Sequence, residues 1–247
     1  MRLCAALILT VTLFAVCPIL PAWAESPLTA EEPALDRAIE QYIRSHPEVI
    51  EQALQSLEVK RQEDERLRVV QAVATHQEEL LRDPASPVSG NLTGDVTVIE
   101  FFDYRCGYCK RVASAVTQLQ KDDSGVRVVY KDFPILGEAS VFGARAALAA
   151  REQGKHQPFH EAMLASDNEL TKEEVFAIAQ RVGLDVKKFE SDLHAPERQA
   201  AIDRNRALAT LLGISGTPGF VVGGEVYPGA LELTRLKALV AQARTKR

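Results

Sequence analysis

Apolar residues recur along this chain with distinct periodicities, which predict where strands and helices lie. Val96–Tyr104 and Val126–Lys131 are rich in β-branched and aromatic residues, as strands are. A helix is expected between them, followed by helical segments over about 138–213 that contain no strand. A hairpin around Gly223–Gly224 and a last helix over Leu231–Arg244 complete the order. The expected order is therefore β-α-β, a helical block, then β-β-α, which is an α/β arrangement.

The helical block has its own start signals. Thr171-x-x-Glu174 has the spacing of a capping box, which marks a helix N-terminus. The helices expected here are 140–153, 159–165, 171–182, 186–193 and 196–212.

The segment before this domain, residues 25–90, predicts a helical arm. Ser45 is expected to cap a helix that begins near Pro47, and apolar stripes follow over 50–57 and 67–81. The span between the stripes is almost entirely polar. The pattern fits a helix packed on its own domain with a solvated middle, or an oligomerisation segment with an exposed connecting region. Residues 83–90 are expected to be a loop that opens the domain of residues 91–247.

Residues 1–24 have the pattern of a cleaved secretory signal. Arg2 supplies a positive charge, residues 3–20 are mostly apolar, and Ala22-Trp23-Ala24 is a small-x-small cleavage site. An uncleaved anchor is the alternative; lipidation of Cys17 is disfavoured because Val16 is large. The pattern therefore predicts export, with a periplasmic location.

Net charge says little about binding partners. The chain has a formal net charge of -5, and loss of Arg2 makes it one unit more negative. This balance is ordinary for a soluble protein and gives no indication of nucleic-acid binding.

The cysteines carry the candidate chemistry. Cys4 and Cys17 leave with the signal, so the mature chain keeps only Cys106 and Cys109, spaced as Cys-x-x-Cys. A structural zinc site normally needs four ligands, and a static disulfide over so short a loop constrains the unfolded chain little. Redox chemistry is favoured, because Cys-x-x-Cys beside a βαβ pattern is a recognised redox signal.

The pair is expected to sit where a helix begins. A cysteine there faces unpaired backbone N–H groups and the positive end of the helix dipole. Both favour the thiolate, which is the attacking species in disulfide exchange.

Four stretches together resemble the thioredoxin superfamily, specifically DsbA-like thiol oxidoreductases with an inserted helical domain. They are Glu100–Cys109, Lys131-Asp-Phe-Pro134, Phe159-His-Glu161 and Gly216-Thr-Pro-Gly-Phe220. The resemblance covers essentially all of residues 91–247. It implies a thioredoxin-like fold preceded by the helical arm.

The arm adds a second, shorter resemblance. Ile39–Ile50 is similar to the N-terminal segment of the ScsC branch, the suppressor-of-copper-sensitivity proteins. In that branch the arm can form trimers that isomerise disulfides. A homo-oligomer, with a trimer as the first expectation, is therefore implied.

The resemblance assigns roles around the redox motif. Cys106 is implied to be the exposed nucleophile and Cys109 the buried resolving thiol of a redox-active disulfide, with Gly107 and Tyr108 between them facing the substrate. These intervening residues bring no positive charge, whereas some relatives carry a histidine there. A strongly oxidising potential is therefore in doubt.

Thr217 and Pro218 are implied to bind substrate. Pro218 is expected to be a cis-proline that faces the disulfide and turns the Thr217 backbone toward a substrate strand. The alternative is an ordinary trans-proline at the start of a strand.

Glu100 and Lys131 are candidate catalytic residues. Glu100 lies in an otherwise apolar strand, so burial is expected to raise its pKa and make it a proton acceptor for Cys109. Lys131, on the next strand, is expected to pair with it. The alternative for both is a surface ion pair.

His156 and His160 are four residues apart, but Pro158 makes a shared helical face doubtful, so cap or core histidines are favoured over a metal pair. No cofactor or resident metal is expected. Cu(I) bound by the two thiolates is a second hypothesis, a copper-binding periplasmic chaperone, although no methionine-rich tract supports it.

The sequence thus predicts a periplasmic thiol-disulfide oxidoreductase that forms, reduces or isomerises disulfides. Its expected partners are cysteine-containing exported proteins and a membrane redox partner of the DsbB or DsbD/ScsB type. Isomerisation is favoured if the protein is oligomeric.

Overall fold

The computed structural model describes residues 32–167 and 169–246. The expected signal sequence, 1–24, lies outside these residues. The chain divides after Glu58 into two compact units, which are taken separately below.

A five-stranded sheet forms the centre of the larger unit, residues 59–247. Its strands are β1 (Val88–Gly90), β2 (Val96–Phe102), β3 (Val126–Asp132), β4 (Gly219–Val222) and β5 (Glu225–Pro228), in the order β1-β3-β2-β4-β5. β2 and β3 are parallel, and the other pairs are antiparallel. The α/β order expected from the sequence is confirmed, whereas β1 lies in the segment expected to be a loop.

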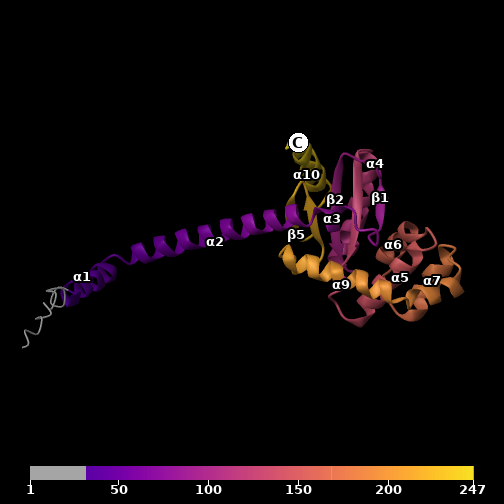
Figure 1. Ribbon diagram of the computed structural model, residues 1–247, viewed down its shortest axis with the longest axis horizontal. Coiled ribbons are helices and arrows are strands. Elements are labelled where there is room, and N and C mark those ends of the chain that lie inside the picture. The colour runs from indigo at the N-terminus through magenta and orange to yellow at the C-terminus, as the bar shows by residue number, and fades with distance from the viewer. Residues whose placement is uncertain (1–31, 168, 247) are drawn as a thin grey trace, which may run out of the picture. The chain divides into compact units, whose positions relative to one another are not determined.

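Helices cover both faces of this sheet, and a helical block lies at one end of it (Figure 1). The helix that follows β2 is α4 (Gly107–Asp122), and the last helix is α10 (Leu233–Thr245). The block consists of α5 (Glu138–Arg151), α6 (His156–Ala165), α7 (Lys172–Arg181), α8 (Val186–Leu193) and α9 (Pro196–Leu211). As expected, the Thr171 side chain caps α7 by accepting a hydrogen bond from the Glu174 N–H.

The two faces of the sheet bury different side chains. On one face, Phe102 and Tyr130 pack in a core that includes Cys109 and residues of α4 and α10. On the other face, Phe101 and Val129 pack with residues of α9 and of the segment before β1. β2 and β3 are therefore buried on both sides, and six of seven residues in each are buried.

The segment before β1 contributes to this second face. α2 (Pro47–Thr75) ends with Val73 buried, and α3 (Gln77–Leu81) contributes Leu80. One alternative for the arm was a helix packed on its own domain. The end of α2 and α3 pack in this way.

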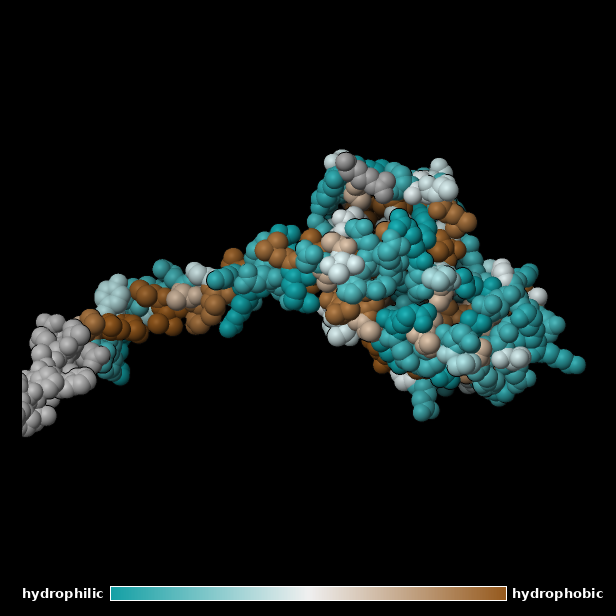
Figure 2. Space-filling model, viewed as in Figure 1, coloured by the Kyte–Doolittle hydropathy of each residue, from teal (hydrophilic) through white to brown (hydrophobic). Residues whose placement is uncertain are grey.

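The remainder of the arm exposes its apolar side chains. α1 (Glu32–Ser45) is followed directly by α2, and Ser45 does not cap α2 as expected: it ends α1, and its hydroxyl donates to the Gln41 carbonyl (2.8 Å). Figure 2 shows apolar residues along this part of the chain. The exposed large apolar residues here are Leu35, Ile39, Tyr42, Ile43, Val49, Ile50, Leu54, Leu57, Val59 and Leu67.

None of the helices in the described part of the chain is both long enough and apolar enough to cross a membrane.

Candidate active site

The redox motif sits where β2 gives way to α4, as the sequence predicted. Cys106 is the N-cap of α4, its N–H donates to the Asp103 carbonyl (3.0 Å), and its own carbonyl accepts from the Lys110 N–H (3.0 Å). This position is next to the unpaired N–H groups of the first helical turn, although the Cys106 side chain makes no capping hydrogen bond. Both cysteines are free thiols in this structure.

Cys106 is less exposed than expected. Its relative exposure is 6%, against 0% for Cys109. The cause is a loop far along the chain: the Cys106 thiol donates to the Thr217 carbonyl at 3.2 Å. The order of accessibility implied by the resemblance holds, and the Thr217 loop lies directly beside the Cys106 sulfur.

The Thr217–Pro218 peptide bond is cis, which confirms the expected cis-proline. The Pro218 carbonyl accepts from the Gly229 N–H (2.9 Å), so the end of β5 supports this loop. The cis bond and the Thr217 carbonyl are thus placed directly against the Cys106 sulfur.

Cys109 and Glu100 are both inaccessible to solvent, at 0% and 1% exposure. Burial raises the pKa of Glu100 to about 8, and its Oε1 has no hydrogen-bond partner among the described residues. Burial also raises the pKa of Cys109 above its usual range, and the Glu100 charge raises it further. Cys109 therefore needs a proton acceptor before it can attack, and Glu100 is the adjacent carboxyl group.

Lys131 does not pair with Glu100, so that prediction is wrong. In the parallel register Glu100 lies opposite Tyr130, and Lys131 lies opposite Phe101. Side chains alternate along a strand, which puts Lys131 on the opposite face of the sheet.

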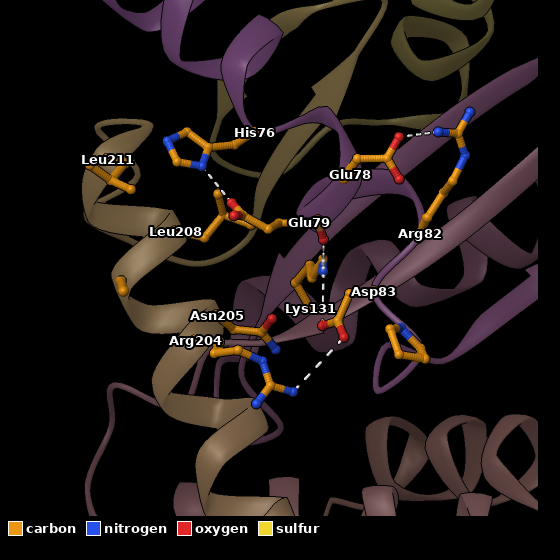
Figure 3. A pocket seen from close by; sticks show the side chains of 12 residues that line it. His76, Glu78, Glu79, Arg82, Asp83, Lys131, Arg204, Asn205, Leu208 and Leu211 are labelled. Atoms are coloured by element: carbon orange, nitrogen blue, oxygen red, sulfur yellow. Dashed lines mark hydrogen bonds and ion pairs between the residues drawn. The ribbon is translucent and has the colours of Figure 1, made fainter.

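The segment before β1 supplies the partners of Lys131 instead (Figure 3). Its ammonium group donates to the Glu79 carbonyl (2.5 Å) and the Ser86 hydroxyl (2.8 Å), and it lies 3.5 Å from the Asp83 carboxylate. Lys131 borders a pocket of about 440 Å³ between this segment and α9. Burial lowers the pKa of Lys131 despite the Asp83 charge. Lys131 thus fixes the segment to the sheet.

The histidines belong to the core, as favoured from the sequence, but Pro158 does not separate them. His156 and His160 share a face of α6, with stacked rings 5.4 Å apart at their centroids, because a proline in the first turn is compatible with a helix. The His160 Nδ1 and Tyr104 hydroxyl are hydrogen-bonded at 2.9 Å, and burial lowers the pKa of His160 to about 3. No metal-binding group of three or more His, Cys, Asp or Glu occurs among the described residues.

Sequence reasoning missed two buried acids near the motif. Asp103 and Asp132 are each 1% exposed, and burial raises the pKa of Asp132 to about 8. Asp103 lies near the end of the predicted strand Val96–Tyr104 and Asp132 directly follows the predicted strand Val126–Lys131, so a search for acids at strand ends would have found both.

The match to known families decides the assignment. Residues 97–241 match the DsbA-like thioredoxin domain. This chain belongs to that family. The match extends from β2 into α10, so it contains the redox motif, the helical block and the cis-proline loop.

Solved structures agree with this assignment. A thioredoxin-like oxidoreductase from Silicibacter pomeroyi is 47% identical, with a TM-score of 0.67 over 68% of this chain and 98% of that one. The thiol-disulfide exchange protein alpha-DsbA2 from Wolbachia pipientis is 30% identical, with a TM-score of 0.67 over 70% and 95%. Proteus mirabilis ScsC in a transitional conformation is 25% identical and covers more of this chain, 88%, and 99% of its own, with a TM-score of 0.67. The chain is thus a DsbA-like protein that resembles ScsC.

The chain also resembles part of larger proteins. The Na(+)/H(+) antiporter NhaA 3 from Salinispora tropica is 33% identical over 158 residues, which are 63% of this chain and 24% of that protein. The chain therefore matches about a quarter of the length of this curated relative.

In this DsbA-like domain, we expect Glu100→Gln to slow the resolution step by about 100-fold, because the amide cannot accept the Cys109 proton. The mixed disulfide of Cys106 with glutathione would be formed by mixing the reduced protein with excess oxidised glutathione. Its decay would then be followed by rapid quenching at a series of pH values. Wild-type decay should rise with pH and level off above about 8, where Glu100 is ionised. A Glu100→Gln profile with the same inflection would rule out this role.

Stability provides a separate check on Glu100. Since the folded pKa of Glu100 is about 8 and its ordinary pKa is 4.5, the folded state keeps a proton between these pH values that the unfolded state has lost. Its contribution to the free energy of unfolding should therefore fall as pH rises through this window. Glu100→Gln should remove this part of the pH dependence of the free energy of unfolding, as measured by urea titrations at several pH values.

We expect Lys131→Met to destabilise the domain by about 2–4 kcal/mol, because Asp83 loses its buried partner. Urea unfolding at neutral pH measures the loss. Exchange by the folded variant should stay near the wild-type rate, since Lys131 lies on the face away from Glu100. If the pH profile of mixed-disulfide decay in Lys131→Met matched that of Glu100→Gln, the two residues would share a role in the resolution step after all.

Proposed function

We propose that this protein is a periplasmic thiol-disulfide oxidoreductase that acts on exported proteins through Cys106 and Cys109. The proposal rests on one observation above all. A cysteine at the N-cap of α4 meets the carbonyl before a cis-proline, with a second, buried cysteine one turn further into the helix. The periplasmic location rests on the secretory pattern of residues 1–24.

The oxidising direction begins with the Cys106–Cys109 disulfide. A substrate thiolate attacks the Cys106 sulfur, and a substrate–Cys106 disulfide forms while Cys109 leaves and takes up a proton. A second substrate thiolate then attacks the substrate sulfur of this bond. A substrate disulfide forms, Cys106 leaves as a thiolate, and the protein has gained two electrons.

Reduction runs through the same bonds in reverse. Cys106 attacks a substrate disulfide, and Cys109 resolves the mixed disulfide after passing its proton to Glu100. Isomerisation uses only the first half: Cys106 opens a wrong disulfide, and another substrate thiolate displaces Cys106. A membrane partner of the DsbB or DsbD/ScsB type would set the resting redox state of the pair.

Isomerisation is the proposed mode if the protein is oligomeric. The arm supports oligomerisation, because α1 and the first part of α2 expose apolar residues such as Leu35, Ile39 and Leu54. ScsC from Proteus mirabilis is similar over 88% of this chain. The resemblance of Ile39–Ile50 to the ScsC arm makes a trimer the first expectation. Several Cys106 sites on one assembly could engage one misfolded substrate repeatedly.

The direct test is catalysis by the mature protein. We expect it to accelerate insulin reduction by dithiothreitol and to restore activity to ribonuclease with scrambled disulfides. Lack of acceleration in both assays by a folded protein would reject the proposal. Reduction of insulin without recovery of ribonuclease would reject the isomerase mode alone.

A further inference from the structure

The surface around Cys106 carries cationic side chains that lack acidic partners. Arg105 precedes Cys106, and Lys110 and Arg111 follow in the first turns of α4. Lys110 donates to the Ser166 carbonyl (2.5 Å) and Arg105 to the Leu136 carbonyl (2.6 Å), and neither these two nor Arg111 forms an ion pair within the described residues. The chain as a whole is acidic, with a net charge of -5. The redox motif is thus flanked by three cationic side chains that form no ion pair among the described residues.

Arg111 is held in a defined place beside the motif. Its guanidinium carbon lies 4.3 Å from the centroid of the Tyr108 ring, in a cation–π contact. Both side chains are exposed, Tyr108 by 59%. The ring supports the charge without neutralising it, so the guanidinium N–H groups remain available to a carboxylate.

An apolar pair of residues lies beside Arg105. The buried Asp103 carboxylate accepts hydrogen bonds from the N–H groups of Arg105 (2.8 Å), Ile135 (2.8 Å) and Leu136 (3.0 Å). This clamp presents Ile135 and Leu136 at 41% and 43% exposure beside the motif. Apolar neighbours reduce the access of water, which strengthens charge interactions across a bound segment.

Carboxylates close to the site do not cancel this charge. Asp103 is 1% exposed, and its charge is shared among backbone N–H groups. Glu138 is exposed in the first turn of α5 and follows Gly137, which lies beside the Arg105 guanidinium. Glu174 accepts a hydrogen bond from the hydroxyl of Ser166, whose carbonyl accepts from Lys110. Arg105, Lys110 and Arg111 form no ion pair among the described residues, so these neighbouring carboxylates weaken the positive charge without pairing with it.

We propose that Arg105, Lys110 and Arg111 select substrate segments in which acidic residues flank the reacting cysteine. This inference rests on the proposed function and specifies its substrate class: extended, acidic polypeptide segments that reach Cys106 beside the Thr217 carbonyl. The cations both attract such segments and hold the carboxylates while the mixed disulfide forms.

A competition experiment tests this selection. Two otherwise identical peptides carry one cysteine flanked by aspartate or by lysine, each as a mixed disulfide with neutral 2-mercaptoethanol. In full mature protein carrying Cys109→Ser, the Cys106 thiolate attacks the peptide sulfur, the peptide–mercaptoethanol bond breaks, and mercaptoethanol thiolate leaves. The trapped products are counted by mass spectrometry. Rates of the same peptides with uncharged dithiothreitol correct for their intrinsic reactivity.

We expect the acidic peptide to react about tenfold faster at low salt, after this correction. The preference should shrink as salt is raised, since exposed charges are screened. Arg105→Gln combined with Arg111→Gln should bring the ratio close to one. Arg61→Gln combined with Arg66→Gln, at two exposed arginines of α2, removes the same number of charges and is the matched control; it should retain the ratio of the Cys109→Ser protein.

The outcomes separate this inference from the proposed function. If both peptides react at equal corrected rates with the Cys109→Ser protein that keeps both arginines, acidic selection is wrong while exchange stands. If neither peptide nor the mercaptoethanol disulfide alone reacts with Cys106, the proposed function itself fails. A ratio that is unaffected by the arginine substitutions assigns the selection to other residues and overturns the proposal.

Discussion

Replacement of Cys106 by serine should abolish disulfide exchange, whereas replacement of Cys109 should leave the first step and block the second. A serine hydroxyl is not ionised at neutral pH and forms no disulfide, so Cys106→Ser loses the attacking group. Cys109→Ser keeps the accessible sulfur but lacks the thiol that resolves the mixed disulfide. Its substrates should accumulate as covalent adducts.

The two variants serve as controls for each other, because each removes one sulfur from the same helix. Both should retain the wild-type far-ultraviolet circular dichroism spectrum. Insulin turbidity measures turnover, and non-reducing gels reveal adducts that disappear on treatment with dithiothreitol. Insulin reduction by Cys106→Ser at the wild-type rate would overturn the assignment of the nucleophile. Adducts on Cys106→Ser but not on Cys109→Ser would reverse the roles of the two cysteines.

Removal of the arm up to Glu58 should give a monomer that keeps dithiol exchange and loses isomerase activity. The cut follows from the structure: Val73 and Leu80 are buried in the core on the second face of the sheet, and Glu79 and Ser86 hold Lys131. A cut further along the chain would damage the catalytic unit itself. A chain beginning at Val59 keeps these contacts and discards α1.

The expected driving force for the proposed assembly is burial of the exposed apolar side chains of α1 and the first part of α2. Each Å² of apolar surface removed from water contributes about 25 cal/mol. Light scattering on the mature protein and on the shortened chain measures the change in mass, and ribonuclease recovery measures isomerase activity. A full mature protein that is already monomeric would contradict the expected oligomer.

A point substitution tests the same surface without removing the arm. Ile39 is 48% exposed on α1, and Ile39→Asp should shift the assembly toward monomer. Gln41 lies two residues further along the same helix and is exposed, so Gln41→Asp adds the same charge as a matched control. Equal effects of the two substitutions would show that charge, rather than loss of the apolar contact, disrupts the assembly.

Local patterns in the sequence predicted most elements and the redox motif correctly. The strand before Cys106, the helix after it and the Thr171 cap depend on residues that are close in the chain. The cis-proline was implied by the family resemblance of the segment that contains it. Such features need little knowledge of the remaining fold.

The errors concern residues whose surroundings come from distant segments. Lys131 was paired with the wrong partner because strands buried on both faces lack the alternation that shows which way a side chain points. The covering of Cys106 depends on Thr217, which is 111 residues away. β1 is a three-residue strand recognisable only through its pairing with β3.

The division of the chain after Glu58 has a consequence for engineering. The segment from Val73 to Ser86 packs against the unit of residues 59–247 through its own side chains. Position 59 is therefore a suitable point at which to fuse another protein segment. Coiled coils of chosen strand number, grafted there in place of the native arm, would set how many redox sites each particle carries. A dimer, a trimer and a tetramer of the same catalytic unit would then separate the effect of the number of redox sites from the effect of the reactivity of each site.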